Sequence, residues 1–183
     1  PFKTVSDYDN WIKRAGAFGA WTDSAIVYFR KGMANGYILP RCLVVKMIPQ
    51  MEAMVTADPV KSLFYGPANL IPGSFSTADK ARVTAALVKL INETLTPAYK
   101  RLGDFLQNEY LPKSRTSVGY DDLPDGNELY AYLIRYWTTT DKTPEEIYQT
   151  GLSEVKRIRE AMELTKIKTG FSGDLPSFFT FMK

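Results

Sequence analysis

The sequence predicts an all-α fold of several long helices packed antiparallel, and three observations support this prediction. Apolar residues recur at intervals of three and four along most of the 183-residue chain, the period of an amphipathic helix. Clear alternating patterns, which would predict strands, are missing. Helix start signals precede the periodic segments, and Gly or Pro residues follow them. The exception is a Pro/Gly-rich segment near residues 112–126, which we expect to be irregular.

The first predicted helix begins with a capping signal. Ser6 and Asp9 have the spacing of a capping box, which predicts a helix that runs towards Lys31. Gly32 and Gly36 follow this segment and are expected to end the helix.

The next segments alternate between helix and loop. A second helix is expected from about Pro40 to Val55, with a kink at Pro49 because proline removes a helical hydrogen bond. Residues 56–73 contain three prolines and two glycines, which predicts a short helix within a loop.

The clearest periodicity belongs to a third long helix. Ser76 with Asp79 predicts its start, the apolar pattern continues to about Tyr110, and Pro97 is expected to bend it. A short helix over residues 127–137 should follow. We expect that helix to bury Leu129, Leu133 and Tyr136.

The strongest start signal in the chain is Thr143-Pro144-Glu145-Glu146. Here Thr is the cap, Pro occupies the first helical position, and the acidic side chains meet the positive end of the helix dipole. Gly170 is expected to end this helix. Its predicted apolar positions and i,i+4 ion pairs are Ile147, Val155, Ile158 and Met162, with Lys156–Glu160 and Arg159–Glu163.

Composition excludes several classes of active site. The chain has no His and one Cys, so a Ser-His-Asp triad, a Cys-His dyad and an internal disulfide are impossible, and a zinc site has too few ligands. A net charge of +3 does not indicate a nucleic-acid partner. No apolar run is long enough to predict a membrane span, and residues 1–11 do not resemble a signal peptide.

Several short motifs have a structural interpretation that we prefer to a catalytic one. Ser153 and Lys156 followed by Lys168-Thr169-Gly170 match the nucleophile motifs of β-lactamases, but the second motif should lie on a strand and here ends a helix. Residues 16–19 and 170–173 match Gly-x-x-Gly, the phosphate clamp of some RNA-binding domains, without a basic cluster around them.

Acidic pairs and the lone thiol are interpreted in the same way. Asp121-Asp122 and Glu145-Glu146 are adjacent carboxylates, whereas general acid–base catalysis needs two carboxyl groups on either side of a substrate. We therefore expect turn chemistry for the first pair and a helix-dipole role for the second. Cys42 is expected to be a small buried apolar residue.

Tyrosines and threonines form the remaining candidate surface. Four tyrosines cluster near the irregular segment, and we expect mainly core packing, with a groove as the alternative. Thr138, Thr139 and Thr140 are β-branched and predict an extended stretch with free polar backbone groups. The tyrosines are Tyr120, Tyr130, Tyr132 and Tyr136.

The region Leu123–Ile158 resembles a bacterial family known as domain of unknown function 885. The resemblance rests on Leu-Pro-x-Gly, a Tyr-rich segment, Thr-Thr-Thr, Thr-Pro-Glu-Glu-Ile and Gly-Leu-x-Glu-Val. It extends over essentially the whole chain through further positions: Tyr8, Asn10-Trp11, Arg14, Gly32, Gly36-Tyr37, Leu39-Pro40, Tyr110-Leu111-Pro112, Arg115 and Gly119.

The resemblance implies a relative of zincin-like metallopeptidases whose zinc site uses a His-Glu element and a Pro-Gly-His element near the C-terminal end. No histidine here can be matched to that site. We therefore expect residues 1–183 to be one helical domain, the N-terminal portion of such a protein, which walls a peptide-binding cleft. Zinc would belong to the full-length protein. The resemblance also suggests the bacterial cell envelope or periplasm as the location.

The expected substrate-binding residues are those that combine a family motif with polar character: Tyr130, Arg135, Thr138, Thr139 and Thr140. The expected partners are the C-terminal catalytic half and a peptide substrate, with self-association through exposed apolar surface. Two alternatives stay open. One is a self-standing helical interaction module without enzymatic activity, and the other is a carboxylate-only hydrolase that uses Asp121 and Asp122.

Overall fold

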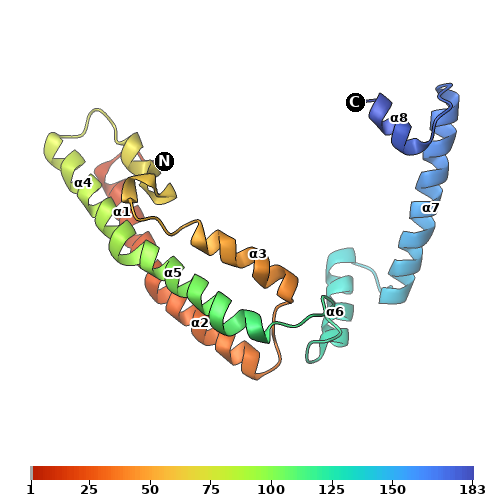
Figure 1. Cartoon of the computed structure of the whole chain (residues 1–183), viewed down its shortest axis with the longest axis horizontal. Helices are drawn as coiled ribbons and strands as arrows, with labels where there is room; N and C mark the ends of the chain where they lie inside the picture. Colours follow the sequence, from red (N-terminus) through yellow and green to blue (C-terminus); the bar gives the residue numbers. More distant parts are fainter. Residues whose placement is uncertain (1) are drawn as a thin grey trace. The chain divides into compact units, whose positions relative to one another are not determined.

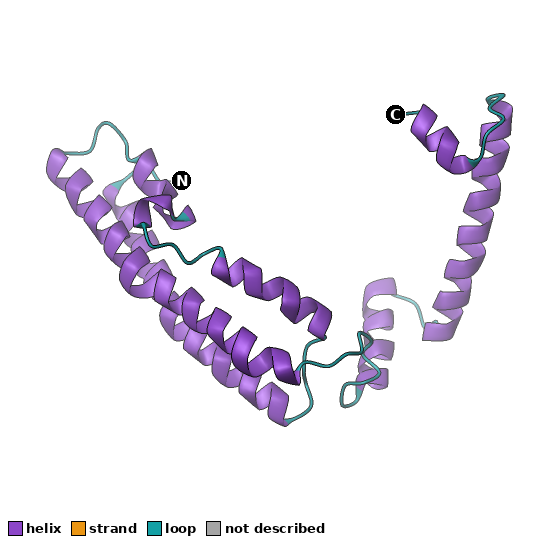
Figure 2. Cartoon of the chain, in the orientation of Figure 1, coloured by secondary structure: helices purple, strands orange, loops and turns teal. Residues whose placement is uncertain are grey.

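The computed structural model describes residues 2–183, which form helices and loops without a β-strand (Figures 1 and 2). One isolated bridge pairs Pro40 with Arg115. The all-α prediction is confirmed. The chain divides into two compact units, an N-terminal unit up to Pro124 and a C-terminal unit from Asp125 to Lys183. Whether residues 1–183 act as one domain of a longer protein stays a prediction.

The N-terminal unit contains five α-helices together with shorter 3-10 and π-helical turns. Their bounds are α1 Val5–Gly16, α2 Phe18–Ala34, α3 Arg41–Glu52, η1 Pro59–Lys61, η2 Leu63–Leu70, α4 Thr77–Leu90, η3 Ile91–Leu95, α5 Thr96–Phe105, η4 Leu106–Tyr110 and η5 Leu111–Lys113. The C-terminal unit contains α6 Gly126–Thr138, α7 Pro144–Lys168 and α8 Leu175–Phe181.

The helix predicted from Ser76 to Tyr110 is confirmed as a continuous helical segment from α4 to η4. The Ser76 hydroxyl accepts a hydrogen bond from the Asp79 backbone N–H at 3.0 Å. Two π-helical turns, η3 and η4, interrupt its α-helical pattern, and Pro97 lies just after η3, in the first turn of α5. Helices α1 and α2 pack along this segment, and α3 packs on α5 (Figure 1).

The core of the N-terminal unit lies along the long helical segment. Val44 and Ile48 from α3 pack there against Leu102 and Phe105. Tyr8 from α1 is fully buried against α4. The periodic apolar positions therefore do what an amphipathic stripe predicts: burying each such side chain contributes roughly 1.5–3 kcal/mol.

The N-terminal boundary differs from the prediction. The capping box is formed by Thr4 and Asp7: the Thr4 backbone N–H donates to the Asp7 carboxylate at 2.7 Å, and the Asp7 N–H donates to the Thr4 hydroxyl at 3.3 Å. The two residues have the same spacing as Ser6 and Asp9 and start the helix earlier. The predicted single helix is divided at Ala17, next to Gly16, whose helix propensity is low.

The C-terminal unit confirms the predicted start and end of α7. Thr143 and Glu146 form a capping box, with the Thr143 N–H donating to the Glu146 carboxylate at 2.7 Å. Thr169 caps the end, and Gly170 has a φ of 77°. The i,i+4 pairs expected on α7 are replaced by two i,i+3 pairs, Arg157–Glu154 and Lys166–Glu163.

The faces of α6 and α7 are more exposed than predicted. Helix α6 buries Ile134, whereas Leu129 and Tyr136 are exposed and Leu133 is half-buried. Helix α7 buries no residue, because in its unit it packs only against α8 and lightly against α6. Leu175 and Phe178 of α8 are buried there. Across the part of the chain that is described, no helix combines the length and apolar character needed to cross a bilayer.

Candidate functional site

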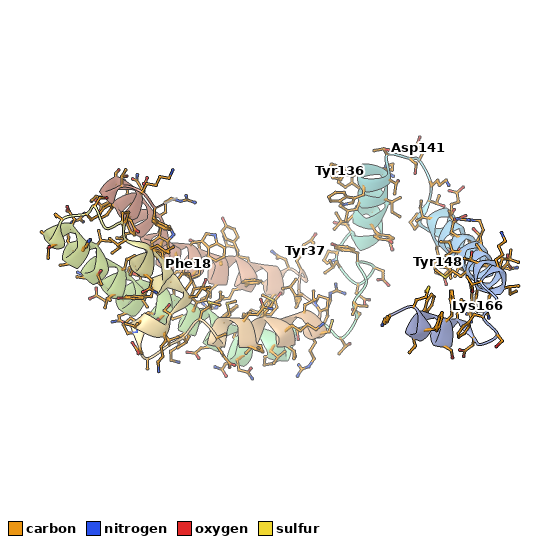
Figure 3. The ribbon with its side chains drawn as sticks, turned by 90° about the horizontal axis from the view of Figure 1, so that it is seen from above. Phe18, Tyr37, Tyr136, Asp141, Tyr148 and Lys166 are labelled. Carbon is orange, nitrogen blue, oxygen red and sulfur yellow. The ribbon has the colours of Figure 1, made fainter. Side chains whose placement is uncertain are left out.

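Tyr130 and Arg135 both lie on α6, at different positions around the helix axis. They are five positions apart, which separates them by about 140° around the helix axis. Tyr130 is exposed and makes an interaction of its own, and Arg135 is exposed. The structure therefore presents the two side chains on different sides of α6. Figure 3 shows this helix with Tyr136 labelled.

The threonine triplet is brought together, but it is not the extended stretch that the sequence predicts. Thr138 is the last residue of α6, and its hydroxyl donates to the Ile134 carbonyl at 2.7 Å. The Thr138 and Thr140 hydroxyl oxygens lie 2.9 Å apart. Thr139 has a φ of 54°, and its N–H donates to the Arg135 carbonyl. The prediction of free backbone groups was wrong, because these N–H groups and hydroxyls close the end of the helix.

Several motif residues instead hold two loops together, and we call this contact the loop clasp. The Leu39 N–H donates to the Tyr110 hydroxyl at 2.8 Å, and the Arg41 N–H donates to the Arg115 carbonyl at 2.7 Å. The Arg115 guanidinium donates to the carbonyls of Ile38, Ser117 and Gly119. The loop before α3 is thereby fastened to the irregular segment after η5.

The turn that leads into the loop clasp requires glycine at positions 32 and 36, two of the positions that carry the family resemblance. The Tyr37 N–H donates to the Gly32 carbonyl at 2.9 Å, and a Cβ atom on Gly32 would lie 2.8 Å from the Tyr37 carbonyl oxygen. Gly36 has a φ of 83°, in the left-handed region that glycine adopts without strain. Gly32, Gly36 and Tyr37 therefore form a helix-ending turn.

The two acidic pairs lie in the first turn of α7 and in an exposed turn before α6. The Glu146 carboxylate accepts hydrogen bonds from the Thr143 backbone N–H and hydroxyl, and the backbone bond is the main reason that its pKa is lowered. Glu145 accepts from Gln149 at 2.7 Å. Asp121 and Asp122 are exposed in a turn, as the structural interpretation predicted.

Ser153 and Cys42 are the candidate nucleophiles of the sequence, and each lies on a helix. Ser153 lies on α7, and its hydroxyl donates to the Thr150 carbonyl at 2.8 Å. Cys42 is exposed at the start of α3, so the prediction of a buried thiol was wrong. The reason is its position on the helix: the next residue but one, Val44, takes the buried face of α3.

A metal site is not built from this part of the molecule. Within residues 2–183, no group of three or more His, Cys, Asp or Glu side chains is placed to hold a metal ion. These residues do not fit the ligand set that zinc requires. Zinc in a longer protein stays a prediction.

Helices α7 and α8 present a largely apolar surface with a pocket of about 450 Å³. Ile158 and Met162 of α7 line it together with Phe178 and Phe179 of α8 and with Met182, which follows α8. Leu152 and Val155 extend the same stripe of α7 and are exposed. Tyr148, labelled in Figure 3, begins the stripe. An apolar helix face of this kind is typical of a surface that another segment covers.

A second pocket, which sequence reasoning missed, lies in the N-terminal unit. It has a volume of about 560 Å³ and is lined by residues from α1, α2, η2, η3 and α5. Trp11 of α1 and Phe18 of α2 are among its lining residues. The feature of the sequence that could have indicated this pocket is Arg14, a charged residue that lies between the aromatic residues Trp11 and Phe18.

Comparison with known proteins identifies the family of the whole chain. The family described as "Bacterial protein of unknown function (DUF885)" matches residues 1–183. A solved structure, "The crystal structure of the putative lipoprotein from Colwellia psychrerythraea", shares the fold with a TM-score of 0.88 at 19% sequence identity. The similarity covers 95% of this chain and 30% of that one, so this chain spans under a third of that protein's length. A search of curated proteins gave no match. The chain belongs to the bacterial family DUF885.

Proposed function

We propose that this chain is the non-catalytic helical portion of a zinc-dependent peptidase-like protein, in which it walls the substrate cleft. The observation that carries the proposal is that the same helical arrangement recurs as 30% of a longer chain. The residues described here hold no metal-binding group, so zinc and its ligands would come from the rest of the longer protein. That C-terminal catalytic half is the proposed partner, and a peptide is the proposed substrate.

The apolar surface of α7 and α8 supports the idea of a covering partner. It carries a pocket of about 450 Å³ lined mostly by apolar side chains, and α7 buries none of its residues. Exposed apolar area of this extent is costly in water, at about 25 cal/mol per Å². The rest of the longer protein would cover it. Without that partner, the chain is expected to self-associate through the same surface.

The proposed contacts with substrate come from α6 and its C-terminal end. The Arg135 guanidinium offers paired donors to a peptide carboxylate or carbonyl. Tyr130 contributes a hydroxyl, and the residues Thr138–Thr140 contribute hydroxyl groups at the end of the helix. Because Tyr130 and Arg135 lie on different sides of α6, one bound peptide would contact them only by passing around the helix end, where the threonines lie.

A self-standing interaction module is the alternative, and one observation favours it. Helix α6 exposes Tyr132, Tyr136 and Trp137, with the last two at 61% and 76% exposure. The Tyr132 and Tyr136 rings stack with their centroids 6.1 Å apart, so the two side chains lie together on this exposed face. Aromatic residues of this kind are enriched where proteins bind one another.

The lipoprotein description of the Colwellia protein supports an envelope location for the longer protein. This proposal agrees with the location that the family resemblance suggests. Fractionation of cells that produce the longer protein would test it, with recovery in the envelope fraction as the expected result.

Hydrogen exchange on α7 and α8 tests the proposed packing. We expect slow amide exchange in the longer protein and faster exchange in residues 1–183 alone, with light scattering showing association of the isolated chain. Gly151, which lies on α7 with open space around it, allows a matched control: Gly151→Ala should leave the difference unchanged. Equal exchange in both proteins, with a monomeric isolated chain, would favour the interaction module.

A further inference from the structure

The N-terminal pocket of about 560 Å³, which Trp11 and Arg14 help to line, contains a continuous series of aromatic rings. Trp21 and Phe18 on α2 stack with centroids 5.5 Å apart and an interplanar angle of 19°. The ring centroids of Phe18 and Tyr99, which lies on α5, are 4.7 Å apart. The Tyr99 ring stacks on Phe64 of η2, with the centroids 5.7 Å apart. Three separate elements therefore supply the rings, and each ring contacts at least one other ring of the series. Figure 3 shows Phe18 among the helices of this unit.

Arg14 is the charged residue of this pocket. The remaining lining residues are aromatic or aliphatic, and none is acidic. In the part of the chain that the structure describes, the Arg14 guanidinium has no hydrogen bond or ion pair. The other arginines of the unit are all engaged: Arg30, Arg82 and Arg101 pair with carboxylates, while Arg41 and Arg115 bond backbone carbonyls.

The other polar side-chain atoms of the lining are also hydrogen-bond donors. Trp11 and Trp21 carry indole N–H groups, which can only donate, and Tyr99 carries a hydroxyl. Burial raises the pKa of Tyr99, which keeps that hydroxyl protonated. The side chains of the pocket therefore combine flat apolar faces with donors and one positive charge.

We propose that this pocket binds an aromatic carboxylate. The rings would stack on the aromatic group, and Arg14 would pair with the carboxylate through its planar set of donors. Aromatic pockets often bind cations, but the guanidinium of Arg14 opposes a second positive charge here. A volume of about 560 Å³ is within the range of small-molecule sites.

This proposal goes beyond the function proposed above and does not depend on it. The pocket lies wholly in the N-terminal unit, whereas the proposed substrate contacts and the covered apolar surface lie in the C-terminal unit. Two sources of the ligand share the same chemistry, a free aromatic acid and a peptide that ends in an aromatic residue. The relative affinities of a tetrapeptide and of N-acetylphenylalanine distinguish these two sources.

Tryptophan fluorescence gives a direct reading of the pocket. Trp11 and Trp21 line it, and the third tryptophan, Trp137, lies in the other unit. In the full chain carrying Trp137→Phe, titration with N-acetylphenylalanine should give a saturable change. We expect about tenfold weaker binding of its amide, corresponding to about 1.4 kcal/mol for the lost charge pair, and no binding of phenethylammonium. Equal affinity for the acid and the amide would overturn the proposal.

A matched pair of variants isolates the role of Arg14. Lys13 and Arg14 both lie in the last turn of α1, but Lys13 does not line the pocket. Lys13→Gln and Arg14→Gln remove the same charge from the same helix end. We expect about tenfold weaker binding of the acid for Arg14→Gln only, with the amide unaffected. Equal losses in the two variants would contradict the proposal.

Salt dependence supplies a test that needs no variant of Arg14. Affinity for the acid should fall as ionic strength rises, while affinity for the amide should stay constant. Ala-Ala-Ala-Phe compared with its C-terminal amide tests the peptide source. Tighter binding of the tetrapeptide than of N-acetylphenylalanine would assign a peptide end, and the reverse would assign a free acid. Absence of binding by both acids would reject the site.

Discussion

Arg30 and Glu109 form a two-point ion pair between α2 and the π-helical turn η4. The Arg30 Nε atom lies 2.8 Å from Glu109 Oε1, and Nη2 lies 2.6 Å from Oε2. Two further arginine–carboxylate pairs, Arg82–Asp9 and Arg101–Asp23, join the same two layers of helices. The three pairs lie at successive positions along the α4–η4 segment. A shift of α1 and α2 by one helical turn along that segment would separate all three pairs.

The first prediction concerns the pH dependence of this pair. The hydrogen bonds from Arg30 lower the pKa of Glu109 below its ordinary value of 4.5 in the folded chain. The unfolded chain therefore binds more protons at acid pH. The contribution of the pair is fully present above the ordinary value and is lost as the pH falls through the lowered pKa. Urea unfolding of Glu109→Gln should show a smaller loss of stability on acidification than the wild type.

Glu93→Gln is the matched control for that measurement. It removes the same charge from the same helical segment, but the Lys89–Glu93 pair is longer, at 3.9 Å, and lies within one helix. We expect this variant to keep the wild-type pH profile. A Glu109→Gln profile that coincides with the wild type would show that the Arg30 pair contributes nothing to stability.

The second prediction concerns the turn at Gly32. Gly32→Ala would place a Cβ atom 2.8 Å from the Tyr37 carbonyl oxygen, so the backbone must shift. We expect a loss of about 1–3 kcal/mol in the free energy of unfolding. Gly66→Ala is the control, because nothing lies within 4 Å of a Cβ atom there. Equal unfolding free energies for the two variants would contradict the assigned turn.

The third prediction concerns the loop clasp. Arg115→Lys keeps the positive charge but cannot reach the carbonyls of Ile38, Ser117 and Gly119 at once. We expect a loss of about 1–3 kcal/mol, because half-buried carbonyls lose their donors. Arg82→Lys should cost less than Arg115→Lys, because its ion pair with Asp9 is exposed to solvent. Chemical unfolding of both variants checks this, and a larger effect at Arg82 would reject the clasp as the stronger contact.

The fourth prediction concerns Thr139. A β-branched residue at a φ of 54° is strained, by roughly 1–2 kcal/mol. Thr139→Gly should therefore slow amide exchange in α6 by stabilising its C-terminal end, while Thr139→Ala, which keeps a Cβ atom, should change little. Faster exchange in Thr139→Gly than in Thr139→Ala would show that the left-handed conformation is not the source of strain.

Much of the fold could be predicted because helix periodicity and capping are local. The segment from Ser76 to Tyr110 and the helix that begins after Thr143 follow directly from apolar spacing and a cap. The predicted helix start at Ser6 was wrong, because Thr4 and Asp7 have the same capping spacing as Ser6 and Asp9 and form the cap instead. The break at Ala17 follows Gly16, a single residue of low helix propensity within an otherwise periodic segment.

The candidate sites were less predictable because they depend on long-range contacts. In the loop clasp, Arg115 contacts a residue more than seventy positions away in the sequence. No local pattern therefore indicates that these residues meet. The aromatic pocket needs Phe18, Phe64 and Tyr99 to meet from three elements. The exposure of Cys42 and of the α7 stripe could not be predicted either, because periodicity identifies an apolar face without identifying what covers it.

Zinc binding and peptide hydrolysis, measured side by side for residues 1–183 and for the longer protein, test the proposed function most directly. The account predicts that the longer protein binds stoichiometric zinc and hydrolyses peptides, whereas residues 1–183 alone do neither, since they lack a metal-binding group. Tight stoichiometric zinc binding together with peptide hydrolysis by residues 1–183 alone would contradict it.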